Sequence, residues 1–138
     1  MYPAEIVIPM KEELTENGFK ELLTATEVEE ALAKKGTTLV MINSVCGCSA
    51  GTARPGTVLA VQSSPKKPDY ITTSFAGFDT EAVSQVRKHL LPYPPSSPAI
   101  ALFKDGQLVH MLERHNIEGY SAQMIADNLI GAFETHCN

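Results

Sequence analysis

Apolar and polar positions along the chain first indicate four strands. Residues 37–43 are apolar on both faces once past two threonines, a pattern typical of a central strand that is covered on both sides. Residues 70–75 are rich in β-branched and aromatic side chains and predict a second strand. Residues 99–103 and 108–112 flank an Asp-Gly pair, and such a pair between two apolar runs predicts a β-hairpin.

Helical spacing and capping signals predict the segments between these strands. Thr26 and Glu29 match a capping box, and Gly36 is suited to close the helix that begins there. Pro55 falls inside another predicted helix, which should kink or restart at that point. Ser121 is suited to cap the last helix. Helices are therefore expected over residues 10–23, 26–36, about 48–63, 79–90 and from 121 onwards.

Three segments give weaker or negative signals. Residues 6–8, followed by Pro9, are interpreted as a short edge strand or a lead-in to the first helix. Residues 92–98 contain four prolines, which are too many for a helix or strand to form, so a rigid loop is expected. Residues 135–138 are expected to be a frayed tail.

The order of these elements predicts an α/β fold. Strand–helix–strand connections favour parallel neighbours, and the hairpin adds an antiparallel edge. The compact solution is a four-stranded mixed sheet flanked by helices, preceded by extra N-terminal helices. This arrangement is similar to the thioredoxin core, and we expect residues 1–138 to form one such domain.

Composition excludes several classes of function. The net charge of −5 argues against nucleic acid or an acidic membrane surface as the main partner, because either would require a basic face. No run approaches 18 apolar residues, and the first residues lack the basic and hydrophobic regions of a signal peptide. We therefore expect a cytoplasmic protein.

The three cysteines supply the candidate chemistry. Cys46 and Cys48 flank Gly47 where the central strand passes into a helix, and Cys137 lies near the C-terminus. A helix N-terminus carries unpaired N–H groups and partial positive charge, so it lowers the pKa of a nearby thiol. An odd cysteine count without a secretion signal does not indicate a structural disulfide framework.

This pair predicts thiol–disulfide exchange. Cys46, outside the helix, is the better nucleophile, and Cys48, one step into the helix, is placed to resolve the mixed disulfide. One intervening residue makes a tight ring, which should be easily reduced, and Gly47 is expected to relieve part of its strain through backbone angles that a side chain forbids. No cofactor is implied.

Two other interpretations of the cysteines remain open. Free cysteines are often buried as small hydrophobic residues in a core. A Cys-x-Cys pair can also bind a soft metal ion, with Cys137 or His136 as further ligands, or act as a redox sensor without turnover. No second pair of ligands precedes residue 110, so our main prediction includes no metal.

Three residues outside the pair are candidates for the same site. In a thioredoxin core the loop opposite the dithiol ends in a cis proline beside which an extended substrate can pair, and Ser97-Pro98 stands at the matching place. Arg54 follows the thiols by one to two helical turns. It could add positive potential or meet a substrate carboxylate, or it could be a solvated surface residue.

The sequence resembles the bacilliredoxins, thioredoxin-fold proteins with a Cys-Gly-Cys site. The resemblance spans nearly the whole chain and is carried by Asn43-Ser44-Val45-Cys46-Gly47-Cys48, Ala50-Gly51, Ala53-Arg54-Pro55, Pro94-Pro95-Ser96-Ser97-Pro98 and Glu113-Arg114-His115. It implies reduction of mixed disulfides between proteins and a low-molecular-weight thiol, bacillithiol in that family, or more general disulfide exchange and isomerisation. It also matches Cys46 to the attacking cysteine and Cys48 to the resolving one.

Overall fold

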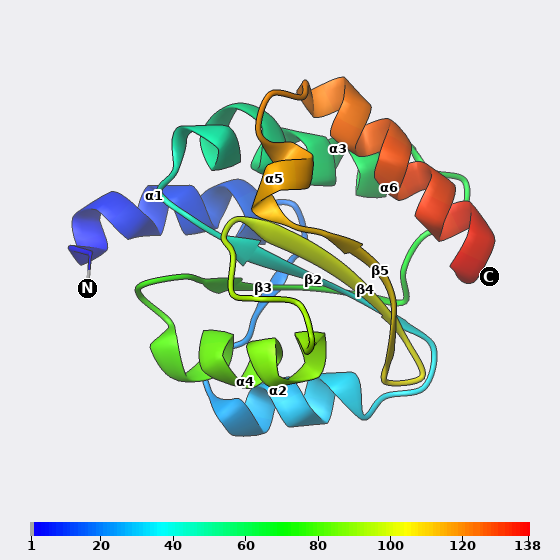
Figure 1. The fold of residues 1–138 in the computed structure, drawn as a ribbon, viewed down its shortest axis with the longest axis horizontal. Helices are drawn as coiled ribbons and strands as arrows, with labels where there is room; N and C mark the ends of the chain where they lie inside the picture. The colour runs from blue at the N-terminus through cyan, green and yellow to red at the C-terminus, as the bar shows by residue number, and fades with distance from the viewer. Residues whose placement is uncertain (1) are drawn as a thin grey trace.

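The computed structural model describes residues 2–138 as one mixed β-sheet with helices on both faces (Figure 1). The strand order is β1-β3-β2-β4-β5. β2 pairs in parallel with β3 and antiparallel with β4, and β4 forms the hairpin with β5. The strands are β1 (Lys20–Glu21), β2 (Thr37–Asn43), β3 (Tyr70–Phe75), β4 (Ala99–Lys104) and β5 (Gln107–Leu112).

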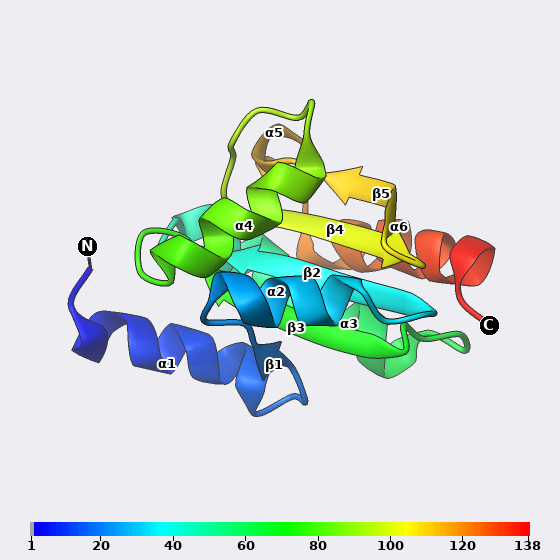
Figure 2. The same ribbon diagram turned by 90° about the horizontal axis from the view of Figure 1, so that it is seen from below.

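The helices form a layer on each side of the sheet. Figures 1 and 2 show α2 and α4 on one face, with α1, α3 and α6 on the other. The close packing of α3 against α6 and of α2 against α4 completes the two layers. The helices are α1 (Ala4–Thr15), α2 (Ala25–Leu32), α3 (Arg54–Ser63), α4 (Thr80–Leu90), α5 (Arg114–Ile117) and α6 (Ala122–His136).

β2 is the central strand that the apolar run predicted, and all seven of its residues are buried. Alternate side chains of a strand point to opposite faces. Leu39 and Met41 accordingly join the core beneath α3 and α6. Val40 and Ile42 join the core beneath α2 and α4. The strand is therefore packed on both sides, so the segment that follows Asn43 starts from a rigid part of the core.

The N-terminal region differs from the prediction. Residues 6–8 lie in α1, which spans Ala4–Thr15, and not in a strand or a lead-in. Val7 and Leu14, two helical turns apart, are both fully buried, so burial of this face outweighs the β-branched composition. The helix predicted over 10–23 is wrong beyond residue 15, because Gly18 adopts a positive φ of 90° and the chain then forms β1.

β1 makes the sheet five-stranded instead of four-stranded. It pairs in parallel with β3 through two residues only, Lys20 opposite Thr72 and Glu21 opposite Thr73. A two-residue strand has no periodicity to detect, so the apolar pattern could not reveal it. The short helix α5, between β5 and α6, is a further element that was not predicted. The other strands and helices of the thioredoxin-like arrangement follow the predicted order.

Three helix ends also need correction. The N-cap of α2 is Thr24, not Thr26, and the Thr24 hydroxyl accepts a hydrogen bond from the Glu27 N–H (3.1 Å). The helix ends at Leu32 with Ala33 as its C-cap, so it is not closed by Gly36. The C-terminal segment is not frayed, because α6 continues to His136 and Cys137 is only 4% exposed. The predicted hairpin and the Ser121 cap of α6 are confirmed.

Within residues 2–138, no helix has both the length and the apolar character that crossing a membrane requires.

Candidate active site

The dithiol lies directly after the C-terminal end of β2. Helical residues run from 47 to 63, first as the start of a helix, then as a π-helical turn over Ser49–Ala53, then as α3. The Cys46 carbonyl accepts hydrogen bonds from the N–H groups of Ser49 (3.0 Å) and Ala50 (3.2 Å). Cys46 therefore stands at the start of the helix, and the predicted strand-to-helix position is confirmed.

Pro55 explains the change of winding in this helix. It lies at the first turn of α3, directly after the π-helical turn. Proline has no N–H to offer the carbonyl four residues earlier, so the regular α-helical ladder cannot pass through it. The predicted restart is observed at this place.

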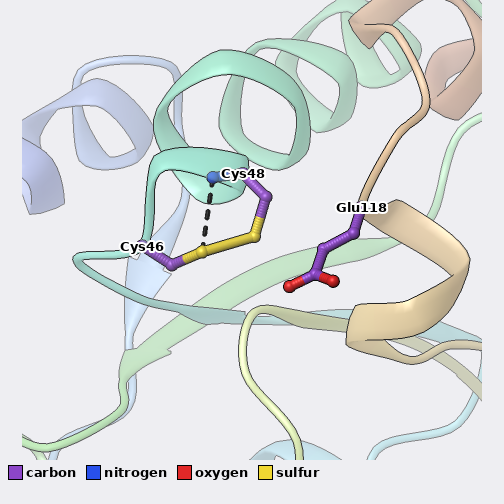
Figure 3. A group of neighbouring side chains, drawn as sticks. All are labelled: Cys46, Cys48 and Glu118. Atoms are coloured by element: carbon purple, nitrogen blue, oxygen red, sulfur yellow. Dashed lines mark hydrogen bonds between the residues drawn. A yellow bond between two sulfur atoms is a disulfide. The ribbon is translucent and has the colours of Figure 1, made fainter.

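Cys46 and Cys48 are joined by a disulfide, with their Cα atoms 5.4 Å apart (Figure 3). Both residues are half-buried, and Gly47 between them is exposed. The Cys48 N–H donates a hydrogen bond to the Cys46 sulfur (3.3 Å). The interpretation of these cysteines as core residues is therefore wrong, since the pair sits at the surface in a bonded form.

Gly47 does not have the role expected for its backbone. It is helical and is not among the residues with positive φ. A Cβ added to it would meet no other atom within 4 Å. Any residue can adopt this backbone, so the absence of a side chain leaves open space beside the sulfurs and relieves no strain.

Arg54 is buried beneath the site, with 2% of its surface exposed. Its Nη1 donates to the Asn43 side-chain oxygen (2.9 Å) and to the Ser44 carbonyl (2.8 Å). It also donates to the Ser49 hydroxyl (3.2 Å). The residue is therefore neither solvated nor available to a substrate carboxylate, and it ties the end of β2 to the first helical turn.

Arg54 has one acidic neighbour, contributed by α1. Its Nε lies 3.1 Å from a Glu13 carboxylate oxygen, an ion-pair distance without hydrogen-bond alignment. Half of the Glu13 side chain is exposed, so solvent screens this pair. On its other side the guanidinium donates to the carbonyl of Ser44, two residues before Cys46.

The Ser97–Pro98 peptide bond is cis, as predicted. Ala99, the next residue, pairs with Ile42, so Pro98 lies beside the end of β2 from which the dithiol extends. The Ser97 carbonyl accepts a weak hydrogen bond from Arg114 Nη1 (3.4 Å). The fold therefore brings the proline loop and the cysteines to the same edge.

Glu118 is the residue of this site that the sequence analysis did not identify. It follows α5, and its carboxylate lies within 4.8 Å of both sulfurs (Figure 3). Arg114, one turn earlier, pairs with it through Nε. An i,i+4 Arg–Glu pair is a common surface feature, so only the fold reveals its position beside the cysteines.

The further metal ligands that the sequence suggested are elsewhere. Over residues 2–138, the side chains close enough to share an ion are Cys46, Cys48 and Glu118. Cys137 instead lies beside Thr37, at the other end of β2, where burial raises the pKa of its thiol. His136 is also outside this group. The metal-binding interpretation therefore loses Cys137 and His136 as ligands, and Glu118 is the further side chain beside the two sulfurs.

Comparisons with known proteins agree with this geometry. A family described as Disulphide isomerase matches residues 2–137. A bacilliredoxin of Cytophaga hutchinsonii is 58% identical over 129 residues, which cover 94% of this chain and 95% of that protein. A bacilliredoxin of Halalkalibacterium halodurans is 50% identical over 137 residues, covering 99% and 94% of the two chains.

Solved structures with low sequence identity share the fold. Oxidised mitochondrial thioredoxin 3 from Saccharomyces cerevisiae superposes with a TM-score of 0.59 at 16% identity, covering 89% of this chain and 98% of that one. A thioredoxin mutant from Halobacterium salinarum gives a TM-score of 0.61 at 14% identity, covering 88% and 93%. With full-length relatives at about half identity and a Cys-Gly-Cys pair at the start of a helix in a thioredoxin-like fold, the chain belongs to the bacilliredoxin family.

Proposed function

We propose that this protein is a thiol–disulfide oxidoreductase that reduces mixed disulfides between proteins and a small thiol, with Cys46 as nucleophile and Cys48 as resolving cysteine. The observation that carries the proposal is the Cys46–Cys48 disulfide, half-exposed at the start of a helix. The dithiol form of such a pair supplies the two electrons that reduce a mixed disulfide, and the intramolecular disulfide is the oxidised product.

The first step is attack by the Cys46 thiolate on the mixed disulfide. Its sulfur accepts a hydrogen bond from the Cys48 N–H and lies at the positive end of the helix dipole. Both features stabilise the thiolate over the thiol. A new S–S bond forms between Cys46 and the small thiol, and the electron pair of the broken bond leaves on the protein sulfur, which is then protonated.

The second step is attack by Cys48 on the Cys46 adduct. In the disulfide form the two Cα atoms lie 5.4 Å apart, within the usual range of protein disulfides. The small thiol leaves as its thiolate and takes up a proton. An external reductant must then restore the dithiol for the next cycle.

Positioning of the protein substrate is proposed for Gly47, Ser97 and Pro98. A Cβ on Gly47 would meet no atom, so a substrate backbone can approach the sulfurs closely. Ser97 and Pro98 lie beside the end of β2, where an extended chain could pair like an added strand. Exchange and isomerisation of protein disulfides would use the same surface.

An electrostatic role is proposed for Arg54. A buried cation interacts more strongly than an exposed one, because the low-dielectric interior screens it less. Its hydrogen bond to the Ser44 carbonyl holds it two residues from Cys46. This placement supports a contribution to the stability of the Cys46 thiolate.

Bacillithiol is the small thiol that we propose, because the curated relatives are bacilliredoxins. A disulfide reductase depends on a continuous supply of reductant, which a reducing compartment provides, and we therefore propose that it acts in the cytoplasm. Nucleic acid and membrane surfaces are not proposed as partners, given the net charge of −5.

Adduct mapping tests this proposal. The reduced protein is mixed with a model protein carrying either bacillithiol or glutathione, and the modified cysteine is identified by mass spectrometry. We expect the bacillithiol adduct to move to Cys46, to be trapped there by Cys48→Ala, and not to transfer at all to Cys46→Ala. A Cys46→Ala protein that still reduced the substrate at the wild-type rate would contradict the proposal.

A further inference from the structure

The Glu118 carboxylate faces the disulfide and has no part in the chemistry described so far. Figure 3 shows it pointing at the sulfur pair from the segment that follows α5. Its oxygen lies within 4.8 Å of the sulfurs of both Cys46 and Cys48. That separation permits proton transfer after a small side-chain rotation or through one water molecule.

Glu118 is held in this position from two sides. Arg114 pairs with its carboxylate, and the Glu118 N–H donates to the Arg114 carbonyl (2.9 Å). Ile117, the preceding residue, is fully buried and anchors α5 in the core. Two residues later, the Tyr120 carbonyl accepts a hydrogen bond from the Thr52 hydroxyl (3.0 Å), which ties the segment to the helical turn after the cysteines.

The surroundings of the sulfurs suggest different tasks for the two cysteines. The Cys46 sulfur accepts an N–H hydrogen bond, which suits a thiolate. An ionised carboxylate has no proton to donate and can only accept one. A carboxylate at this site therefore suits a thiol that must lose its proton during the reaction, and in the proposed mechanism that thiol is Cys48.

We propose that Glu118 accepts the Cys48 proton during the resolving step and delivers it to the departing small thiol. As the Cys48 sulfur bonds to Cys46, its proton passes to Glu118. The bond between Cys46 and the small thiol breaks, its electron pair leaves on the small thiol, and Glu118 returns the proton there. One S–S bond forms, one breaks, and Glu118 ends ionised as it began. This inference rests on the proposed function.

The proposal is testable because removing Glu118 has opposite effects on the resolving step if the carboxylate acts only as a negative charge or if it accepts the proton. A carboxylate that acted only through its charge would disfavour the Cys48 thiolate, so its removal would speed resolution. If the carboxylate instead accepts the proton, its removal would slow resolution. The rate would fall most at low pH, where Cys48 is not already ionised.

The experiment follows the Cys46 adduct in time after rapid mixing of the reduced protein with oxidised glutathione. Acid quenching and mass spectrometry give its rate of formation and its rate of decay, and the decay is the resolving step. For Glu118→Gln at about pH 6, we expect decay to slow by roughly tenfold to a hundredfold, with the deficit shrinking as pH rises. Glu118→Asp should recover part of the rate.

Two controls separate this effect from changes in charge or structure. Glu134→Gln removes an exposed carboxylate from α6, far along the chain from the cysteines, and should decay like the wild type. In a Cys48→Ser background, Glu118→Gln should leave adduct formation on Cys46 within about twofold of its parent. Equal losses in formation and decay would indicate a displaced site and would overturn the proposal.

The outcomes also distinguish this inference from the proposed function. Decay in Glu118→Gln that is as fast as in the wild type at every pH, or faster, would overturn the role of Glu118 while leaving Cys46 and Cys48 in theirs. Adduct formation that persisted in Cys46→Ala would overturn the proposed function, and the role of Glu118 with it.

Discussion

At the scale of single residues, Arg54 shows how the site is supported. One guanidinium nitrogen donates to three oxygens, on Asn43, Ser44 and Ser49. Asn43 ends the central strand β2 and Ser44 follows it, whereas Ser49 lies in the first turn of the helix. The orientation of the cysteine segment therefore depends on a buried cation that belongs to the following helix.

Replacing Arg54 by Met should damage both stability and reactivity. Three buried acceptors would lose their charged donor, at a cost of about 3 kcal/mol in the free energy of unfolding, measured by urea denaturation. Loss of the cation should also raise the pKa of Cys46, seen as slower alkylation at neutral pH. An Arg54→Met protein with wild-type stability and wild-type Cys46 reactivity would show that the network carries neither role.

At the scale of elements, the contact between α3 and α6 supports the helix that carries the cysteines. Gly56 lies where these helices approach, and a Cβ there would come within 2.8 Å of the Ala122 carbonyl and 2.9 Å of Ile125. Both distances are shorter than side-chain carbon atoms tolerate. Glycine is therefore required by the spacing of the two helices.

Gly56→Ala should destabilise the protein by about 1–3 kcal/mol, because the helices must move apart to admit the methyl group. Gly51→Ala is the matched control, since a Cβ at Gly51 meets no atom within 4 Å. Thermal and urea unfolding of the two variants measure the difference. Equal stability of the two variants would contradict the close packing inferred here.

The elements that the sequence predicted well are those whose signals are local. Each of these signals lies within the segment that it describes: the apolar run 37–43, the Asp-Gly pair of the hairpin, and Pro55. The structure confirms all three predictions. The N-terminal segment failed because its β-branched residues favour a strand, whereas burial of Val7 and Leu14 against the rest of the molecule favours a helix.

In the candidate site, too, the residues with local sequence signals were predicted and those placed by long-range contacts were not. The cysteines and the cis Ser97–Pro98 bond could be predicted from sequence, because a motif and a loop position mark them. The burial of Arg54 and the approach of Glu118 could not, since both depend on contacts between segments that are distant along the chain. Long-range contacts of single side chains leave no periodic trace in a sequence.

At the scale of the whole molecule, the three cysteines occupy opposite ends of the sheet. Cys46 and Cys48 follow β2, whereas Cys137 is buried beside Thr37, where β2 begins. Burial raises the pKa of the Cys137 thiol, so less of it is in the reactive thiolate form. The structure thus separates a half-exposed cysteine pair from a buried third thiol.

Thiol labelling of the reduced native protein should therefore count two accessible cysteines. Iodoacetamide at about pH 8 is expected to modify Cys46 and Cys48 and to reach Cys137 only after denaturation, with peptide mapping to assign each site. Because burial raises the pKa of Cys137 in the folded state, the free energy of unfolding should fall as pH rises above the pKa of this thiol in the unfolded chain. Rapid labelling of native Cys137 would contradict its burial.

The most direct test of the central claim, that the start of the helix presents Cys46 as a stabilised thiolate, is the pH dependence of its alkylation in the reduced protein. We predict a midpoint for Cys46 well below about 8.5, the ordinary value for a cysteine, and a higher midpoint for Cys48. A Cys46 midpoint at or above that ordinary value, or a midpoint above that of Cys48, would contradict the account.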